Sequence, residues 1–127
     1  MEKSGINTDF ADAFKSRTKK QSVSIIKFLK TIKPNEEMNV IKYQLIKSAT
    51  STAANYRAAC RARSKADFIS KLGIVHEESD ETVFWLEVIE ELEYNSLELT
   101  KLKNESEEIL KIVAKSVATS RANNSKN

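Results

Sequence analysis

The residues best suited to chemistry form an acidic group around His76, the only histidine of the chain. The carboxylates of this group are Glu77, Glu78, Asp80 and Glu81. Carboxylates and imidazoles hold the metal ions of di-iron bundles, but such sites need a Glu-x-x-His motif on each of two helices. The sequence contains no Glu-x-x-His, and no nucleophile or cofactor motif accompanies the carboxylates. We therefore predict no metal, no cofactor and no catalytic residue.

A structural role suits two of these carboxylates better. Glu78 and Glu81 are three residues apart, so they share one face of a helix. We expect that face to lie against Ser51 and Asn55 and to form a polar network that fixes the register of the helices. Because a buried carboxylate is costly without a hydrogen-bonded partner, we expect Asn55 or Arg57 to supply one.

Four basic residues form the candidate binding group: Arg57, Arg61, Arg63 and Lys65. Arg57 and Arg61 lie one helical turn apart and could bind successive phosphates of RNA or DNA. No aromatic residue alternates with this group as base stacking requires, so we expect little sequence preference. Two other roles remain open: offsetting the helix dipole at a C-terminus, and pairing with acidic residues of a neighbouring subunit.

Charge is unevenly divided along the chain, which has 127 residues and a net charge of +3. Residues 1–63 carry 13 Lys or Arg against 5 Asp or Glu, a net +8. Residues 64–127 carry 8 Lys or Arg against 13 Asp or Glu, a net −5. This division indicates either nucleic-acid binding on one side or attraction between helix pairs, within or between subunits.

Cys60 is the only cysteine, so no disulfide can form within the chain. We interpret it as a small buried hydrophobic residue, which suits a reducing compartment. The sequence shows neither a recognisable signal peptide nor an apolar run of about 18 residues. We therefore expect a soluble cytoplasmic protein with no membrane partner.

The elements that position these residues are predicted to be long helices. Two Gly and one Pro leave little turn material for a fold of many strands, and the length suits one domain spanning 1–127. Asn35 is expected to cap the second helix. Ser64 and Asp67 match a carboxylate variant of the capping box that would begin the third. The connection between the third and fourth helices is predicted at 94–96.

The break at Ser64 has one competing interpretation, a single helix from Glu36 to Tyr94. That helix would be about 90 Å long at 1.5 Å per residue, and this chain is too short to bury it. We favour the break. The two ends, residues 1–8 and 122–127, carry no clear apolar pattern, and we expect both to be flexible.

Apolar residues at three-four spacing define the face that each helix should bury. In the first helix this stripe is interrupted by Thr18, Gln21 and Ser22. In the third helix, Val83-Phe84-Trp85 widens the apolar arc, which indicates contact with a neighbouring helix or subunit. The predicted buried set is Phe10, Phe14, Ile25, Leu29, Ile32, Met38, Ile41, Leu45, Ser48, Thr52, Asn55, Ala59, Phe68, Leu72, Val75, Thr82, Leu86, Ile89, Leu99, Leu102, Ile109, Val113 and Val117.

Residues from about Phe10 to Ile112 resemble the four-helix-bundle proteins encoded in intervening sequences of bacterial 23S ribosomal RNA genes. The likeness is strongest at 48–57, Ser-Ala-Thr-Ser-Thr-Ala-Ala-Asn-Tyr-Arg, and at 61–68, Arg-Ala-Arg-Ser-Lys-Ala-Asp-Phe. Many members are expected to carry an acidic residue where this chain has Ala58. The residues that complete the likeness are Glu78, Glu81, Trp85 and Leu86.

The resemblance implies an all-α, left-handed up-down-up-down four-helix bundle that assembles as a cyclic homopentamer. The family is also similar in fold to the pentameric accessory proteins of diversity-generating retroelements, which bind a reverse transcriptase and nucleic acid. The resemblance implies no defined reaction. We predict a non-catalytic oligomeric module that associates with RNA or another nucleic acid through a basic helix surface. The alternative is a protein-interaction scaffold whose charges serve subunit assembly or docking of a protein partner.

Overall fold

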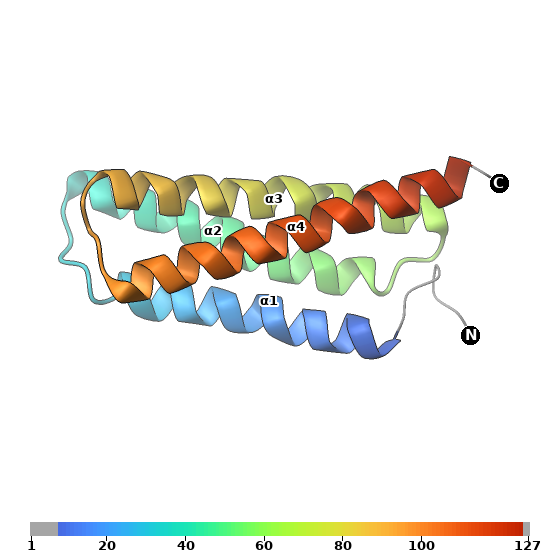
Figure 1. Ribbon diagram of the computed structural model, residues 1–127, viewed down its shortest axis with the longest axis horizontal. Helices are drawn as coiled ribbons and strands as arrows, with labels where there is room; N and C mark the ends of the chain where they lie inside the picture. The colour runs from blue at the N-terminus through green and yellow to red at the C-terminus, as the bar shows by residue number, and fades with distance from the viewer. Residues whose placement is uncertain (1–7, 126–127) are drawn as a thin grey trace.

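The fold consists of four long α-helices. The computed structural model describes residues 8–125, and every regular element within them is helical. Figure 1 shows the helices lying lengthwise beside one another, joined by short connections. The predicted all-α, four-helix architecture is confirmed. The helices are α1 (Thr8–Leu29), α2 (Glu36–Ala59), α3 (Lys65–Glu91) and α4 (Leu97–Ser125).

Side-chain caps begin α2 and α3 where the sequence indicated. Asn35 Oδ1 accepts a hydrogen bond from the Met38 amide at 2.8 Å, and Ser64 Oγ accepts one from the Asp67 amide at 3.1 Å. The Asp67 carboxylate in turn accepts a bond from the Arg63 amide at 3.4 Å, one residue before the cap itself. The chain therefore breaks at Ser64, and the single long helix is excluded.

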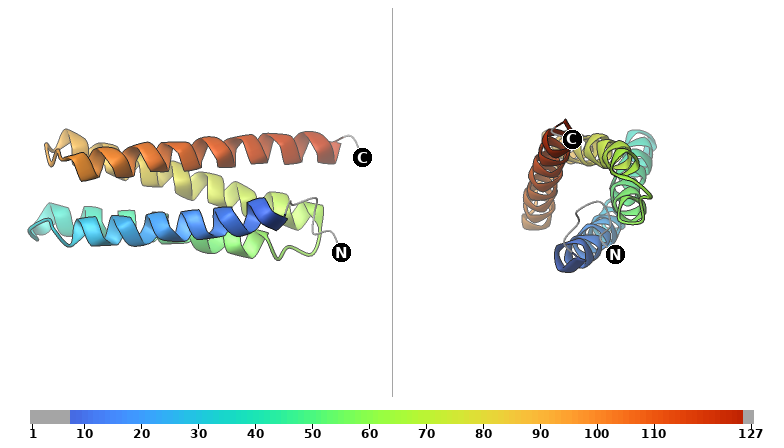
Figure 2. Two further views of the ribbon diagram at one scale, coloured as in Figure 1. Left: turned by 60° about the horizontal axis from the view of Figure 1, so that its bottom comes forward. Right: turned by 90° about the vertical axis from the view of Figure 1, so that its right-hand side faces the viewer.

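Each helix packs against two others and not against the one diagonally opposite. The neighbouring pairs are α1–α2, α2–α3, α3–α4 and α4–α1. The end-on view in Figure 2 shows the same arrangement, with the helices at four corners. The seam between α1 and α2 consequently lies on the opposite side of the bundle from the seam between α3 and α4.

The core divides into two apolar clusters along the bundle. The first joins the last turns of α1 and α3 to the first turns of α2 and α4, and the second joins the remaining ends. Main members of the first are Ile25, Leu29, Met38, Leu45, Leu86, Ile89, Leu99 and Leu102. Main members of the second are Phe14, Tyr56, Ala59, Phe68, Leu72, Val75, Ile109, Val113 and Val117.

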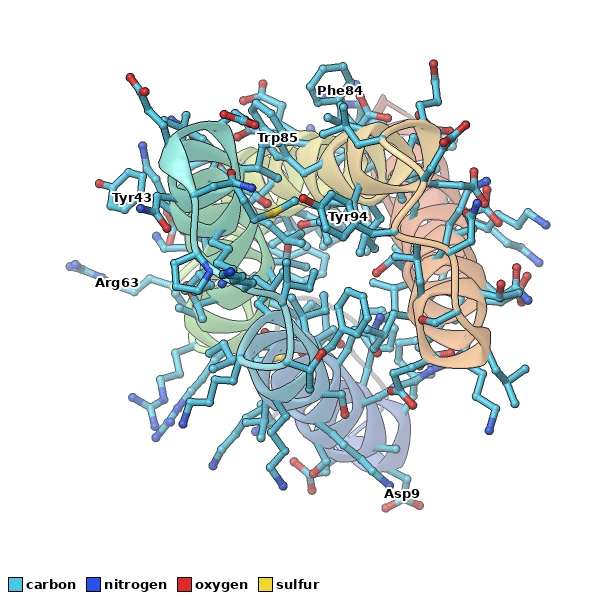
Figure 3. All side chains as sticks on the ribbon, turned by 90° about the vertical axis from the view of Figure 1, so that its left-hand side faces the viewer. Asp9, Tyr43, Arg63, Phe84, Trp85 and Tyr94 are labelled. Atoms are coloured by element: carbon cyan, nitrogen blue, oxygen red, sulfur yellow. The ribbon has the colours of Figure 1, made fainter. Side chains whose placement is uncertain are left out.

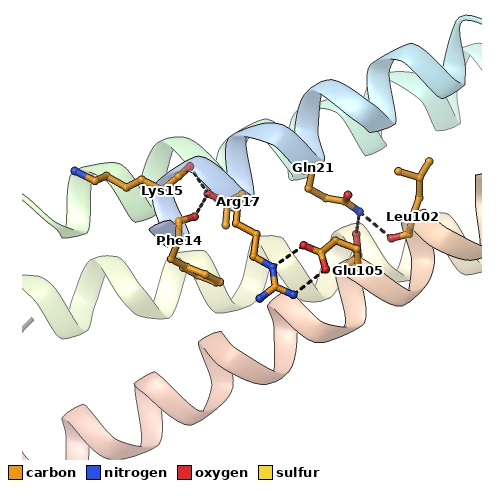
Figure 4. Close-up of polar contacts among 8 residues, drawn as sticks. Phe14, Lys15, Arg17, Gln21, Leu102 and Glu105 are labelled. Carbon is orange, nitrogen blue, oxygen red and sulfur yellow. Dashed lines mark hydrogen bonds and ion pairs between the residues drawn. The ribbon is translucent and has the colours of Figure 1, made fainter. Parts of the chain in front are cut away.

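A buried polar layer separates the two apolar clusters, and every helix contributes to it. Its cross-helix hydrogen bonds run from Ser22 Oγ to the Ala49 carbonyl at 2.8 Å and from Thr82 Oγ1 to Ser48 Oγ at 3.0 Å. The amide nitrogen of Gln21 donates to the carbonyl of Leu102 and to the hydroxyl of Ser106 (Figure 4). The layer consists of Thr18, Gln21, Ser22, Ser48, Thr52, Ser79, Thr82 and Ser106.

The seam between α1 and α4 is the most sparsely packed of the four and is closed by an ion pair. Arg17 donates from Nε to Glu105 at 2.6 Å and from Nη2 at 2.8 Å. This bidentate geometry is visible in Figure 4. The carboxylate raises the pKa of Arg17 through its hydrogen bond, so the pair stays charged and holds α1 beside α4.

Two predictions about helix ends need correction. Phe10 is 44% exposed, because it lies near the first turn of α1 and its ring stacks on Phe14 with 5.5 Å between centroids. The C-terminal segment predicted to be flexible from residue 122 continues as helix to Ser125. No Gly or Pro interrupts α4, and extending an existing helix costs little. The predicted flexibility of residues 1–7 and 126–127 lies outside the described residues.

We predict that Ser64→Ala lowers the free energy of unfolding by about 1 kcal/mol, because the Asp67 amide loses its acceptor. Chemical denaturation followed by circular dichroism measures the loss. Ser70→Ala, at an exposed position within α3, is the matched control and should change stability by less than about 0.5 kcal/mol. Equal effects of the two substitutions would show that the cap does not stabilise the break.

Candidate nucleic-acid interface

A basic groove of about 480 Å³ lies along the seam between α1 and α2. Four cationic side chains line it: Lys15 and Lys19 from α1, Arg57 from α2, and Arg61 just beyond the end of α2. The remaining lining is small, apolar or hydroxyl-bearing, namely Ser16, Ser22, Val23, Ile26, Thr50, Ala53 and Ala54. We call this surface the basic groove.

The register of α1 against α2 places these cations together. Ser22 Oγ is hydrogen-bonded to the Ala49 carbonyl, which fixes the two helices relative to each other. Relative to that bond, Lys15 and Lys19 lie nearer the start of α1, and Arg57 and Arg61 lie nearer the end of α2. On each side the two cations are four residues apart, so they project from one face of the chain in successive turns.

Most of the cations in the basic groove have no carboxylate partner in the part of the chain that the structure describes. Lys15 pairs with Asp12 at 3.2 Å on the surface of α1. Within residues 8–125, no hydrogen bond or ion pair engages the side chains of Lys19, Arg57 or Arg61. These exposed cations are therefore available to an anion from outside.

The structure divides the four predicted basic residues into two pairs. Arg57 and Arg61 line the basic groove, whereas Arg63 and Lys65 lie at the connection between α2 and α3 and do not. All four are exposed. Figure 3 shows the Arg63 side chain pointing away from the bundle. Arg63 and Lys65 therefore extend the positive surface at one end of the molecule without shaping the groove.

The sequence interpretation did not include Lys15 and Lys19 in the candidate binding group. Both belong to a run of lysines in which most members do face solvent. A signal existed in their spacing, because they repeat the four-residue separation of Arg57 and Arg61 on the neighbouring helix. Recognising them as groove residues required the register of α1 against α2, which sequence spacing alone does not give.

The predicted network around Glu78 and Glu81 differs from the contacts observed. Asn55 is half-buried and donates to the Ser51 carbonyl of its own helix at 2.8 Å. Glu81 accepts a hydrogen bond from Trp85 Nε1 at 3.2 Å. The polar contact between α2 and α3 is made instead by the short hydroxyls of Thr82 and Ser48, because carboxylates are far costlier to bury than hydroxyls.

The structure also shows where the remaining candidate residues lie. Cys60 is buried at the end of α2, as predicted. Among the described residues, no group of three or more His, Cys, Asp or Glu is placed to hold a metal ion. None of the helices in that part of the chain combines the length and the apolar character needed to cross a bilayer.

The environment of the half-buried Glu78 carboxyl can be tested by measuring how the stability of the protein depends on pH. Burial raises the pKa of the Glu78 carboxyl, and the charge of Glu81 adds to this, against a smaller opposing effect of Lys47. A raised pKa means that the folded state binds the proton more tightly than the unfolded state. The stability contributed by this group is therefore lost as pH rises from the ordinary Glu pKa through the raised one.

We predict that Glu78→Gln raises the free energy of unfolding at neutral pH and removes this part of the pH dependence. Denaturant titrations from about pH 4 to pH 8 measure both effects. Glu77→Gln removes the same charge from an exposed neighbouring position and should have the smaller effect. A loss of stability at neutral pH on Glu78→Gln would contradict this account of the Glu78 environment.

Comparison with known proteins agrees with this architecture. The family model described as "23S rRNA-intervening sequence protein" matches residues 13–115. A solved structure from Bacteroides thetaiotaomicron VPI-5482, a protein with unknown function from the S23 ribosomal protein family, is 33% identical with a TM-score of 0.75. The match covers 85% of this chain and 97% of that one. Comparison with curated proteins gave no match. The chain therefore belongs to the 23S rRNA-intervening sequence protein family.

Proposed function

We propose that this protein is a non-catalytic module that associates with RNA or another nucleic acid through the basic groove. The observation that carries the proposal is the convergence of Lys15, Lys19, Arg57 and Arg61 on one groove. Three of these cations have no carboxylate partner within the described residues. An elongated anion lying along the seam would contact them in pairs, one helical turn apart.

Phosphate contacts explain both the strength and the selectivity expected of the basic groove. Arginine presents a planar fork that suits bidentate binding of phosphate, and lysine adds a mobile point charge. Contacts to phosphate position a nucleic acid without reading its bases. The groove lining contains no aromatic side chain on which a base could stack. We therefore expect binding that depends strongly on salt and weakly on sequence.

A second candidate function is protein binding at the same surface. It is favoured by the apolar part of the groove, where Val23 is 43% exposed beside Ile26. An acidic amphipathic helix could place apolar residues there and its carboxylates against the arginines. The four cations favour nucleic acid as the leading interpretation. Binding measurements with nucleic acid separate the two.

We further propose that the chain forms a left-handed up-down-up-down bundle and assembles as a cyclic homo-oligomer, a pentamer by resemblance, in a reducing cytoplasm. The two apolar clusters support the alternating connectivity, since each unites the ends of two helices with the starts of the other two. Exposed apolar residues one turn apart on α2 support assembly: Val40 is 58% exposed and Tyr43 is 65% exposed. Figure 3 shows Tyr43 pointing outward from the bundle.

We predict that Arg57→Glu with Arg61→Glu weakens nucleic-acid binding at least tenfold and flattens its salt dependence. Each phosphate contact that is lost removes one released counterion from the equilibrium. Fluorescence anisotropy with structured RNA, single-stranded RNA and duplex DNA at two salt concentrations measures both quantities. Similar losses for all three probes are expected, because the contacts are to phosphate.

The matched control is Lys101→Glu with Lys115→Glu, which makes the same change in charge at exposed positions of α4 outside the groove. This control should lose much less affinity. Circular dichroism and light scattering establish that each variant keeps its fold and mass. If the wild-type protein binds none of the probes at low salt, or if both double variants weaken binding equally, the basic groove is not the nucleic-acid site.

We predict that Val40→Ser with Tyr43→Ser reduces the mass of the assembly measured by light scattering at micromolar concentration. The substitutions remove exposed apolar area that a neighbouring copy would cover. Ile74→Ser, at an exposed apolar position of α3, should leave the mass unchanged. A wild-type protein that is monomeric at this concentration would contradict assembly.

A further inference from the structure

A second groove, on the opposite side of the bundle, has the opposite charge. It has a volume of about 520 Å³ and lies between α3 and α4. Carboxylates of Asp80, Glu87 and Glu107 line it. Lys111 is the only cation among the described residues that line it, and its Nζ lies 3.4 Å from the Glu108 carboxylate. Val83 and Leu110 supply apolar surface beside the exposed ring of Phe84. We call this surface the acidic groove.

Phe84 is the central feature of the acidic groove and is held in place. Phe84 is 51% exposed. The ring packs edge-on against Trp85 with 4.9 Å between centroids. Trp85 Nε1 donates to Glu81 at 3.2 Å. Figure 3 shows Phe84 projecting outward from α3, with Trp85 beside it. The contacts from Glu81 through Trp85 thus fix an aromatic ring that faces solvent.

Carboxylates flank this ring along the helix. Asp80 lies one turn before Phe84 and Glu87 one turn after it, so all three project from the same face of α3. Glu107 faces them from α4. A cation placed over the Phe84 ring would gain a cation–π contact and the attraction of carboxylates on both sides. Phosphate would be repelled by the same charges.

We propose that the acidic groove docks a basic amphipathic helix of a protein partner. A groove between two helices accepts a third helix whose apolar residues enter it at three-four spacing. Complementary charge requires Lys or Arg beside those apolar residues, and the exposed Phe84 ring provides the apolar anchor that central interface aromatics commonly supply. The acidic groove is distinct from the basic groove, so one molecule could hold a basic protein on one side and a nucleic acid on the other.

A second copy of this chain fits the acidic groove less well than an independent helix does. The basic groove gathers four cations, but it is concave like the acidic groove, and two concave surfaces do not interdigitate. A convex helix with one basic and apolar face matches both the shape and the charge. Self-association through Phe84 is therefore an alternative outcome of the test, not the proposal.

The test uses a fluorescein-labelled synthetic peptide of about 18 residues, built from Leu, Lys and Arg as an amphipathic helix. A peptide of the same composition with a scrambled order controls for charge alone. Anisotropy titration of the full-length protein measures affinity. Emission from Trp85, the only tryptophan, reports independently whether the peptide reaches the Phe84–Trp85 pair.

The ordered peptide should bind at least tenfold more tightly than the scrambled one and should change the Trp85 emission. Phe84→Ala should weaken binding about tenfold by removing the apolar anchor. Asp80→Lys with Glu87→Lys should abolish it. The matched control is Asp12→Lys with Glu37→Lys, which makes the same change in charge on α1 and α2 outside the acidic groove. Arg57→Glu with Arg61→Glu should retain peptide binding, which separates this proposal from the nucleic-acid proposal.

Several results would overturn the proposal. Equal affinity for the two peptides, or equal losses in the charge-reversal variant and its control, would leave only general electrostatic attraction. Tight peptide binding that Phe84→Ala does not weaken would place the site elsewhere. If Phe84→Ala lowers the mass measured by light scattering and the wild type binds no peptide, then a second copy of the chain covers the acidic groove. Circular dichroism confirms that each variant is folded.

Discussion

The positions of all four helices depend on the polar layer at the middle of the bundle. Apolar packing is non-directional, so the two clusters of aliphatic and aromatic side chains stabilise the fold without strongly fixing how far one helix slides past another. The hydrogen bonds of Ser22 to Ala49, Thr82 to Ser48 and Gln21 to Leu102 have directions and lengths that only one register satisfies. That register brings the cations of α1 beside those of α2. The polar layer thus links the fold to the basic groove, although none of its hydrogen bonds involves a groove cation.

The helices and their boundaries could be predicted from sequence because their signals are local. Asn35 and Ser64 each bond an amide three residues later, so a short stretch of sequence contains the whole cap. Buried positions repeat at three-four spacing within one helix, which is why Leu72, Leu86 and Leu102 could be identified without knowing their neighbours. The interruption of the stripe at Thr18, Gln21 and Ser22 was visible too, but its meaning required the partners that meet it from the other helices.

Contacts between helices were harder to predict, because spacing shows which face is buried and not which residue lies opposite. Glu78 and Glu81 were expected to meet Ser51 and Asn55, whereas the hydroxyls of Ser48 and Thr82 make that contact. Lys15 and Lys19 could not be told from other surface lysines until α1 was placed against α2. The uneven charge of the two halves was open to two interpretations. In the structure, basic and acidic grooves lie on opposite seams of the bundle, and the two binding proposals rest on this segregation of charge.

We propose that nucleic acid lies in the groove between α1 and α2. Site-specific photo-crosslinking tests it most directly, with a photoreactive residue placed at Ala54 in the basic groove or at Leu110 in the acidic groove. Irradiation with labelled RNA at low salt should give crosslinks from position 54 and few or none from position 110, and added salt should reduce them. Equal crosslinking from both positions, or crosslinking from position 110 alone, would contradict the account.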